Sequence, residues 1–204
     1  FYVPQDITGF TKLLGGKQQL ENQLDKLFTA NDKTSGSHQV DITGLIGQYA
    51  HGNEPSHHMA YLYNFVNKPH KTQEKIRQIL TELYTNTPDG ISGNEDCGQM
   101  SAWYVMSALG LYPIAPGSTN YQIGRPLFKK AKIQLPNNKT LSIEATNNSV
   151  SAKYVKEVSF NTSKVKDTDI DHNQIKKEGL LLIDLSNEPI PISNTIVHEK
   201  DTLL

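Results

Sequence analysis

Glu95 and Asp96 are adjacent carboxylates in a polar loop that is bounded by Gly93 and Gly98 and runs directly into an apolar segment. Like charges held close together push their pKa values apart, so one carboxylate of such a pair can act as a base near neutral pH. The glycines also permit a ligand to approach the backbone closely. A structural alternative exists, because acids in the first turn of a helix favour its dipole. The loop therefore predicts either a hydrolytic site or a helix cap.

A second polar cluster lies upstream, in the segment His51-Gly52-Asn53-Glu54-Pro55-Ser56-His57-His58. A zinc site there is disfavoured, because the helical His-x-x-x-His spacing is absent and Pro55 interrupts a local helix. Asn53 and Glu54 supply adjacent oxygen donors, which a hard cation such as calcium prefers. The competing interpretation is that Asn53 and Ser56 cap the following helix while the histidines form hydrogen bonds inside the core.

Aromatic side chains follow both polar clusters, at spacings that place them on helices. Aromatic rings pack against the C–H faces of sugars, but at helical spacing they are more often part of a core. The residues concerned are Tyr61, Tyr63, Trp103 and Tyr104.

The composition is that of a globular chain without an electrostatic affinity for nucleic acid or membranes. In 204 residues, 20 basic and 21 acidic side chains give a formal charge of −1, and no long block of one sign occurs. No apolar run approaches the roughly 18–20 residues that span a bilayer. Arg125 and Lys129-Lys130 are expected to be solvated charges. Cys97 is the only cysteine, which excludes an internal disulfide and a thiolate zinc site.

Neither the ends of the chain nor its sequons indicate the cellular compartment of the protein. Phe1 begins a stretch with no basic region and no leading methionine, so we expect a cut inside a longer chain and not a signal peptide. Sequons occur at Asn138, Asn147 and Asn161, but such triplets arise often by chance in polar sequence.

The first ~125 residues predict helices joined by irregular segments. Asp6 is placed to cap a short helix that Gly15 and Gly16 end. Further helices are expected over residues 17–30, 57–67, 71–84 and 98–109, with the helix over 57–67 largely buried and residues 31–50 irregular.

After Pro116-Gly117 the pattern changes to short apolar or alternating runs separated by Asn, Gly, Ser and Pro. This pattern is typical of strands, and the spacing suits a small antiparallel β-sandwich-like region. The strands are expected over residues 131–135, 140–145, 154–160, 180–185 and 190–197. The sequence therefore predicts an α+β chain with a helical domain over residues 1–125 and a small β domain over residues 126–204.

Several of these segments resemble glycoside hydrolase family 92, which comprises calcium-dependent exo-acting α-mannosidases. The resemblance is carried by residues 51–58, by residues 93–103 continuing into Ser107-Ala108-Leu109-Gly110-Leu111-Tyr112-Pro113, by Pro116-Gly117-Ser118 and by Tyr121-Gln122-Ile123-Gly124. Phe1–Asp6 and Tyr154–Asn161 are similar to further family segments, so the likeness spans nearly the whole chain.

The resemblance implies an architecture and a reaction. The helical part would be the closing part of an (α/α)6 catalytic barrel. The reaction would be an inverting, calcium-dependent hydrolysis that releases terminal mannose from glycans, with α-1,2 linkages expected. In such a reaction a general acid protonates the leaving oxygen while a second carboxylate activates water, with the two carboxyls about 6.5–9.5 Å apart.

The resemblance also assigns roles to residues. Asp96 is the first candidate for the general base, with Glu95 as its partner or alternate. Asn53 and Glu54 would bind calcium, and Glu54 together with His57, His58 and Trp103 would bind the sugar. The family's acid belongs to a motif just upstream of Phe1, so this chain alone is expected to be nearly inactive.

Two other classes stay open. The chain could be a non-catalytic carbohydrate- or calcium-binding protein that keeps the pocket, or a structural helical domain whose acids are only caps. The expected partners are mannose-containing glycans and the remainder of a parent chain. Exposed faces of an incomplete barrel could also drive self-association. A bacterial origin and a periplasmic or secreted location are implied by the resemblance alone.

Overall fold

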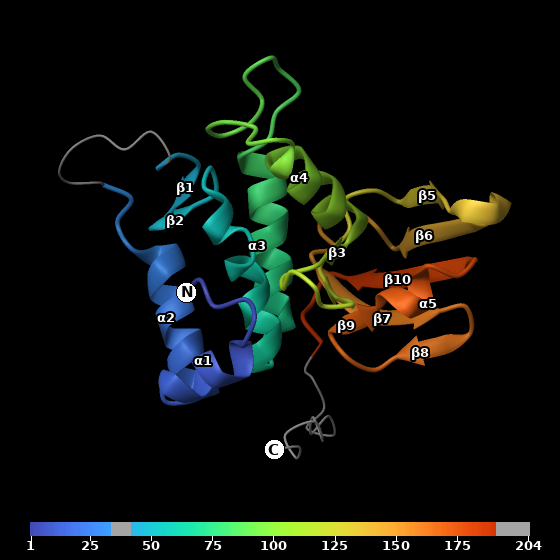
Figure 1. Cartoon of the computed structure of the whole chain (residues 1–204), viewed down its shortest axis with the longest axis horizontal. Coiled ribbons are helices and arrows are strands. Elements are labelled where there is room, and N and C mark those ends of the chain that lie inside the picture. The colour runs from blue at the N-terminus through green and yellow to red at the C-terminus, as the bar shows by residue number, and fades with distance from the viewer. Residues whose placement is uncertain (34–41, 191–204) are drawn as a thin grey trace.

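A computed structural model describes residues 1–33 and 42–190, and it divides into a helical half and a sheet-rich half (Figure 1). The helical half contains α1 (Ile7–Leu13), α2 (Lys17–Thr29), the short strands β1 (Leu45–Ile46) and β2 (Tyr49–Ala50), the 3-10 helices η1 (Glu54–Ser56) and η2 (Met59–Val66), α3 (Pro69–Glu82) and α4 (Gln99–Leu109). The order of helices first and strands afterwards is the one that the sequence predicts.

The capping residues of the helices agree with the sequence analysis. The Asp6 side chain accepts a hydrogen bond from the Gly9 amide at 2.8 Å and so caps α1. Gly98 and Gly110 flank α4 in the left-handed conformation, which glycine adopts without steric cost. The buried helix expected over residues 57–67 is a 3-10 helix, and the segment expected to be irregular contains the β1–β2 hairpin. Residues 34–41 lie outside the described part.

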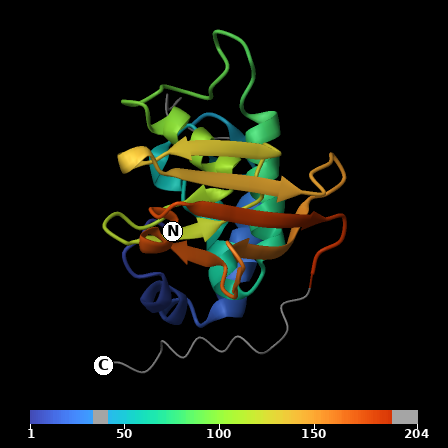
Figure 2. The ribbon, with the colours of Figure 1, turned by 90° about the vertical axis from the view of Figure 1, so that its right-hand side faces the viewer.

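The sheet-rich half holds two sheets. One is five-stranded, in the order β5-β6-β10-β7-β8, and the other is three-stranded, in the order β3-β4-β9. Their strands are β3 (Leu111–Tyr112), β4 (Asn120–Ile123), β5 (Lys130–Gln134), β6 (Thr140–Thr146), β7 (Tyr154–Phe160), β8 (Ser163–Val165), β9 (Asp169–Asp171) and β10 (Gly179–Ser186), with the 3-10 helix η3 (Pro136–Asn138) and the short helix α5 (His172–Ile175) between them. Figure 2 shows the larger sheet spread across the front of the helices.

The strand predictions were largely right, with one correction to the pairing. Strands β5, β6, β7 and β10 match four of the expected runs, whereas the expected strand 190–197 falls almost wholly outside the described residues. Most pairs are antiparallel as expected, but β6 and β10 pair in parallel. Strands β3, β4, β8 and β9 and helix α5 were missed, because they are too short to show a period.

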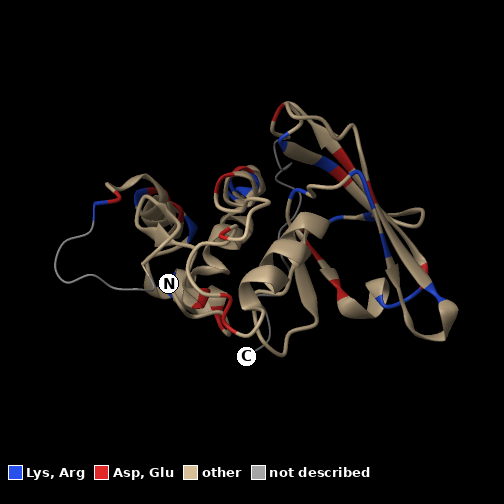
Figure 3. Ribbon diagram, turned by 90° about the horizontal axis from the view of Figure 1, so that it is seen from above, with Lys and Arg blue, Asp and Glu red and all other residues tan. Residues whose placement is uncertain are grey.

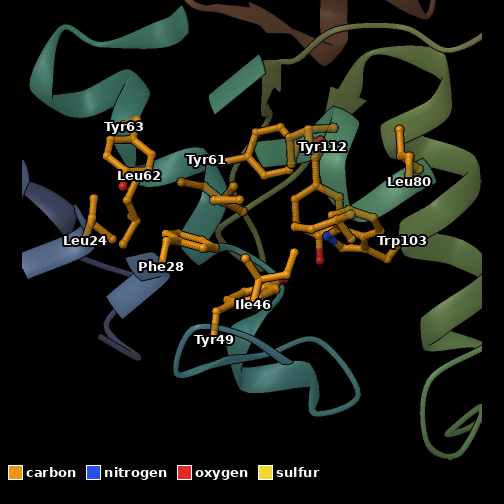
Figure 4. Close-up of a cluster of buried hydrophobic side chains, with 14 of the residues drawn as sticks. Leu24, Phe28, Ile46, Tyr49, Tyr61, Leu62, Tyr63, Leu80, Trp103 and Tyr112 are labelled. Atoms are coloured by element: carbon orange, nitrogen blue, oxygen red, sulfur yellow. The ribbon is translucent and has the colours of Figure 1, made fainter. Parts of the chain in front are cut away.

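The two halves have separate apolar cores. In the helical half, α2, η2, α3 and α4 bury the cluster that Figure 4 draws, which includes Leu24, Phe28, Tyr61, Leu80 and Trp103. In the other half β6 and β10 each contribute three of the buried residues, and the rest come from several shorter elements and from β7. The described helices do not close into a barrel, so the (α/α)6 architecture stays a prediction.

Arg125, which the sequence analysis took for a solvated charge, is buried where the two halves join. It is only 2% exposed. Its Nε and Nη2 donate to the Ala152 carbonyl at 3.1 and 3.0 Å, and Nη1 donates to the Pro126 carbonyl at 2.6 Å. Burial lowers the pKa of Arg125 to about 10. The expectation was wrong because a single arginine in a polar stretch carries no signal of the carbonyls that surround it after folding.

The remaining charges are distributed without a single-sign face. Figure 3 shows blue and red segments interspersed over both halves of the ribbon. None of the helices in the described part of the chain combines the length and the apolar character that a membrane span requires.

Candidate active site

The two polar clusters of the sequence meet because glycines let their loops touch. A Cβ atom on Gly93 would lie 2.8 Å from Thr43 Oγ1 and 3.2 Å from the Gly52 carbonyl oxygen, and one on Gly52 would lie 2.0 Å from Thr43 Oγ1. Gly93 also has a φ of +77°, which other residues rarely adopt. Any side chain at either position would therefore push the two loops apart.

The contact between the loops brings two carboxyl groups together. The side chain of Asp96 interacts with that of Glu54, and this interaction is the largest cause of a raised Asp96 pKa. The negative charges of Glu54 and Glu95 also raise the pKa of Asp96, although the residue itself is exposed. No basic side chain contributes to that shift among the described residues. A carboxyl with a raised pKa beside a second carboxyl is an arrangement that acid–base chemistry uses.

The loop that carries Asp96 has an uncommon backbone. Asp96, Cys97 and Gly98 have φ angles of 51°, 57° and 89° in succession. Left-handed conformations are uncommon outside glycine, although aspartate tolerates them better than most residues, and each costs on the order of 1–3 kcal/mol. Such conformations occur often at functional sites, where the surrounding fold enforces them.

Glu95 is placed differently from its neighbour, because both of its carboxylate oxygens bind the first turn of α4. Ser101 donates to Glu95 through its backbone amide at 2.9 Å and through its hydroxyl at 2.8 Å. The Met100 amide donates to the Glu95 carbonyl at 3.3 Å. Glu95 also lines a hollow with Tyr84, away from Glu54. The structural alternative of a helix cap thus describes Glu95, and Glu54 is the acid that the structure pairs with Asp96.

The three histidines of the upstream cluster are buried and satisfied by protein atoms. His57 Nε2 lies 3.0 Å from the His51 carbonyl oxygen, and His58 Nε2 lies 2.9 Å from the Phe1 carbonyl oxygen. Burial is the largest cause that lowers the pKa of both rings. Each Nε2 atom is therefore engaged as a donor and is not available to a metal.

His51 lies in a directed chain of hydrogen bonds behind the site. Tyr84 Oη donates to the Met100 carbonyl at 3.2 Å and so accepts from His51 Nε2 at 2.7 Å. His51 Nδ1 then accepts from Tyr49 Oη at 2.8 Å. Burial lowers the pKa of His51 to about 3, so the ring is neutral. His51 therefore forms its hydrogen bonds inside the core, which is the competing interpretation of the upstream cluster.

Trp103 lies beneath the site and not on its surface. Its side chain is 0% exposed, and its indole Nε1 donates to the His57 carbonyl at 2.9 Å. The ring is 4.4 Å from that of His51, edge to face. Tyr61, Tyr63 and Trp103 are thus core residues here, as Figure 4 shows, whereas Tyr104 is only partly buried.

A cleft of about 720 Å³ opens next to the carboxyl pair. Its volume is in the range of small-molecule sites. Glu54 is the only acidic residue among the described residues that line it. The lining comes from the N-terminal segment (Tyr2, Pro4), the upstream cluster (Glu54, Pro55, His57, His58), α4 (Gln99, Ala102, Trp103, Met106) and residues 112–118.

The predicted calcium site depends on the oxygen donors that lie near the cleft. Within the described residues no group of three His, Cys, Asp or Glu side chains forms a metal site. The side chains of Glu54 and Asp96 nevertheless offer carboxyl oxygens. No basic side chain is among the causes of the Asp96 pKa shift, so none offsets their negative charge there. A donor set of this kind fits a hard cation that takes its remaining ligands from water or sugar oxygens.

Gln99 and Tyr112 are cleft residues to which the sequence analysis assigned no role. The Gln99 amide nitrogen lies 3.2 Å from His57 Nδ1 and 3.4 Å from the Tyr112 hydroxyl. Both residues stand inside the segments that carry the family resemblance. Their contacts with each other could not be read from the sequence, because they depend on the packing of α4 against residues 112–118.

Comparison with known proteins gives consistent matches. The glycosyl hydrolase family 92 catalytic domain matches residues 1–187. A family GH92 α-mannosidase from Bacteroides thetaiotaomicron, solved in complex with mannoimidazole, is 41% identical, with a TM-score of 0.86 over 93% of this chain and 25% of that one. A family GH92 inverting mannosidase from the same organism is 34% identical, with a TM-score of 0.78 over 92% of this chain and 26% of that one.

A curated relative comes from a fungus. An uncharacterized secreted glycosidase of Arthroderma benhamiae is 27% identical over 92% of this chain and 23% of its own length. The chain thus spans about a quarter of the length of the relatives that it matches.

Proposed function

Because the chain belongs to glycosyl hydrolase family 92, we propose that its cleft is part of the active site of an inverting, calcium-dependent exo-α-mannosidase. The observation that carries the proposal is the pairing of the Asp96 carboxyl with Glu54, which lines the cleft. The mannosidases among the structural relatives, one of them inverting, support the choice of sugar and of stereochemistry.

Asp96 is the general base in this proposal. A raised pKa brings a carboxylate closer to the operating pH, which is the condition for efficient proton transfer. Glu54 holds the Asp96 carboxyl in place. Glu95 stabilises the helix behind them, because both its oxygens are committed to Ser101.

Glu54 is not suited to be the opposing general acid. Glu54 interacts directly with the Asp96 side chain, whereas the two carboxyls of an inverting pair stand roughly 6.5–9.5 Å apart with a water between them. No other acidic residue of the described chain lines the cleft. We therefore assign the acid to a part of the protein beyond the described residues. Without it, hydrolysis is expected to be slower by a factor of about 10²–10⁴, and the isolated chain to be nearly inactive.

Asn53 and Glu54 are the residues that would hold calcium, beside the Asp96 carboxyl. A bound calcium ion would supply positive charge that orients sugar hydroxyls and water at the carboxyl pair.

His57, His58 and Trp103 support the sugar site in different ways. The two histidine rings line the cleft and are fixed by backbone carbonyls. Trp103 is buried, so its role is to hold the turn that carries His57. His57 and His58 are themselves 1% and 4% exposed, so all three residues would shape the wall of the sugar site from beneath.

The organisation of the chain completes the proposal. We assign residues 1–125 to the closing part of an (α/α)6 catalytic barrel and residues 126–204 to a small C-terminal β domain. The remainder of the parent chain would cover the open side of the helices, with self-association as the alternative. The fungal relative that is described as secreted supports an exported protein.

Mannose release from a panel of α-linked mannobioses tests the function. We expect the full encoded protein to release mannose, with the α-1,2 disaccharide hydrolysed fastest. The second candidate, a non-catalytic sugar-binding protein, is favoured by the scarcity of acids around the cleft. Binding of mannobiose without any release, at a calcium concentration that saturates the protein, would decide for that candidate.

A further inference from the structure

The protonation of the His57 ring follows from its partners. Its Nε2 lies 3.0 Å from the His51 carbonyl oxygen, which can only accept, so Nε2 carries the hydrogen. The ring is 1% exposed, and burial keeps it neutral by lowering its pKa. Nδ1 therefore carries no hydrogen, and its lone pair requires a hydrogen-bond donor.

Gln99 supplies that donor, and this fixes which way its amide points. The Gln99 Nε2 atom lies 3.2 Å from His57 Nδ1 and 3.4 Å from Tyr112 Oη. A carboxamide turned the other way would place two acceptors, Oε1 and Nδ1, against each other. The interaction with His57 thus sets the amide orientation that is otherwise ambiguous for glutamine.

The other end of the amide is left free. Among the described residues no donor reaches Gln99 Oε1, and Gln99 lines the cleft. The side chain is half-buried, so its amide oxygen stays accessible. The site therefore holds an acceptor of known orientation, on the first residue of α4 and three residues from Asp96.

We propose that Gln99 is a substrate-positioning residue whose amide oxygen accepts a hydrogen bond from one hydroxyl of the sugar, in an orientation that His57 enforces. This inference rests on the proposed function for the identity of the ligand. It assigns His57 to the orientation of Gln99 and not to direct metal binding. The sugar would gain one directional contact that a hydroxyl of the wrong configuration could not make.

The orientation is tested by long-range ¹H–¹⁵N NMR of the histidine rings in the 204-residue chain. We expect His57 to be neutral with its hydrogen on Nε2. A His57 ring that carries its hydrogen on Nδ1, or on both nitrogens at neutral pH, would overturn the inference whether or not the chain binds sugar.

The sugar contact is tested by titrating methyl α-D-mannopyranoside and its four monodeoxy analogues against the wild-type chain and Gln99→Met. Losing one neutral hydrogen bond should weaken binding by about tenfold. One deoxy analogue should bind the wild-type chain about tenfold more weakly and lose nothing further in the variant. Gln78→Met is the matched control, since Gln78 lies on α3 and bonds Glu82 at 3.0 Å; it should bind every ligand as the wild type does.

The outcomes separate this inference from the proposed function. If Gln99→Met binds the mannoside as tightly as the wild type, or loses the same affinity for every analogue, the inference is wrong and the mannosidase proposal stands. If the wild-type chain binds no mannoside, the inference is overturned for this chain. The proposed function is then judged separately by mannose release from the full encoded protein.

Discussion

The side chains of Glu54 and Asp96 interact with each other, although Glu54 begins η1 and Asp96 lies in the loop before α4, with η2 and α3 between them in the chain. The pair exists because Gly52 and Gly93 allow the loops to touch. The pair holds two acids together without a basic side chain to offset their charge. Such an arrangement destabilises the folded state, which is common at functional sites.

Removing the Asp96 carboxylate should therefore stabilise the protein at neutral pH. A raised pKa means that the folded state holds the Asp96 proton more tightly than the unfolded state does. The contribution of Asp96 to the free energy of unfolding is then fully present below the unfolded pKa of 3.8, and it is lost as the pH rises through the folded pKa. Because Asp96→Asn cannot ionise, its melting temperature should exceed that of the wild type at neutral pH.

Thermal unfolding between about pH 3 and pH 7 checks this prediction. The advantage of Asp96→Asn should shrink toward the acidic end of the range. Asp89→Asn, at an exposed position of the preceding loop, should show no such pH-dependent gain. A lower melting temperature for Asp96→Asn at pH 7 would contradict the account of the pair.

Glu95→Ala should destabilise the protein by about 1 kcal/mol, the usual cost of losing a helix cap. The double variant with Ser101→Ala should cost less than the sum of the two single changes, because the hydroxyl bond at 2.8 Å is shared. Urea unfolding of the four proteins in this cycle gives the coupling. Additive effects would show that Glu95 does not act through Ser101.

The single tryptophan offers a test of where Trp103 lies. Its side chain is 0% exposed, so acrylamide should quench its fluorescence only weakly, and a mannoside should not alter that quenching. Trp103→Phe removes the donor to the His57 carbonyl and leaves a cavity, which should cost about 2–4 kcal/mol. Strong protection from acrylamide on adding the sugar would instead place the indole in the sugar site.

Arg125→Lys should destabilise the junction of the two halves by about 2–4 kcal/mol, even though the charge is kept. A lysine ammonium cannot reproduce the planar set of donors that reaches the Ala152, Ser149 and Pro126 carbonyls. Arg77→Lys is the control, because Arg77 donates only to the Val150 carbonyl at 2.9 Å. Equal urea midpoints for the two variants would rule out the role given to Arg125.

The sequence predicted the long elements well, because their signals are local. Asp6 as a cap, the apolar period of α2 and the glycines around α4 are properties of a few neighbouring residues. Elements such as β9, with three residues, carry no period and form only by pairing with β4. The parallel pairing of β6 with β10 is likewise a long-range choice.

The structure brings several of the predicted site residues together, and their roles stay predictions. Glu54, Asp96, His57 and His58 do meet at one cleft or beside it. The sequence could not separate Glu95 from Asp96, since adjacent acids look alike until the backbone turns at Asp96 and leaves Glu95 bonded to Ser101. The burial of Trp103 and the orientation of Gln99 depend on tertiary contacts, which no local pattern contains.

The most direct test follows the anomer of the mannose first released by the full encoded protein, by proton NMR, with calcium and then with EDTA. The account predicts that β-mannose appears first from an α-linked mannobiose, that release depends on calcium, and that Asp96→Asn slows it by a factor of about 10²–10⁴ while keeping the fold. If α-mannose appeared first, or if Asp96→Asn released mannose at the wild-type rate, Asp96 would not be the base of an inverting mannosidase.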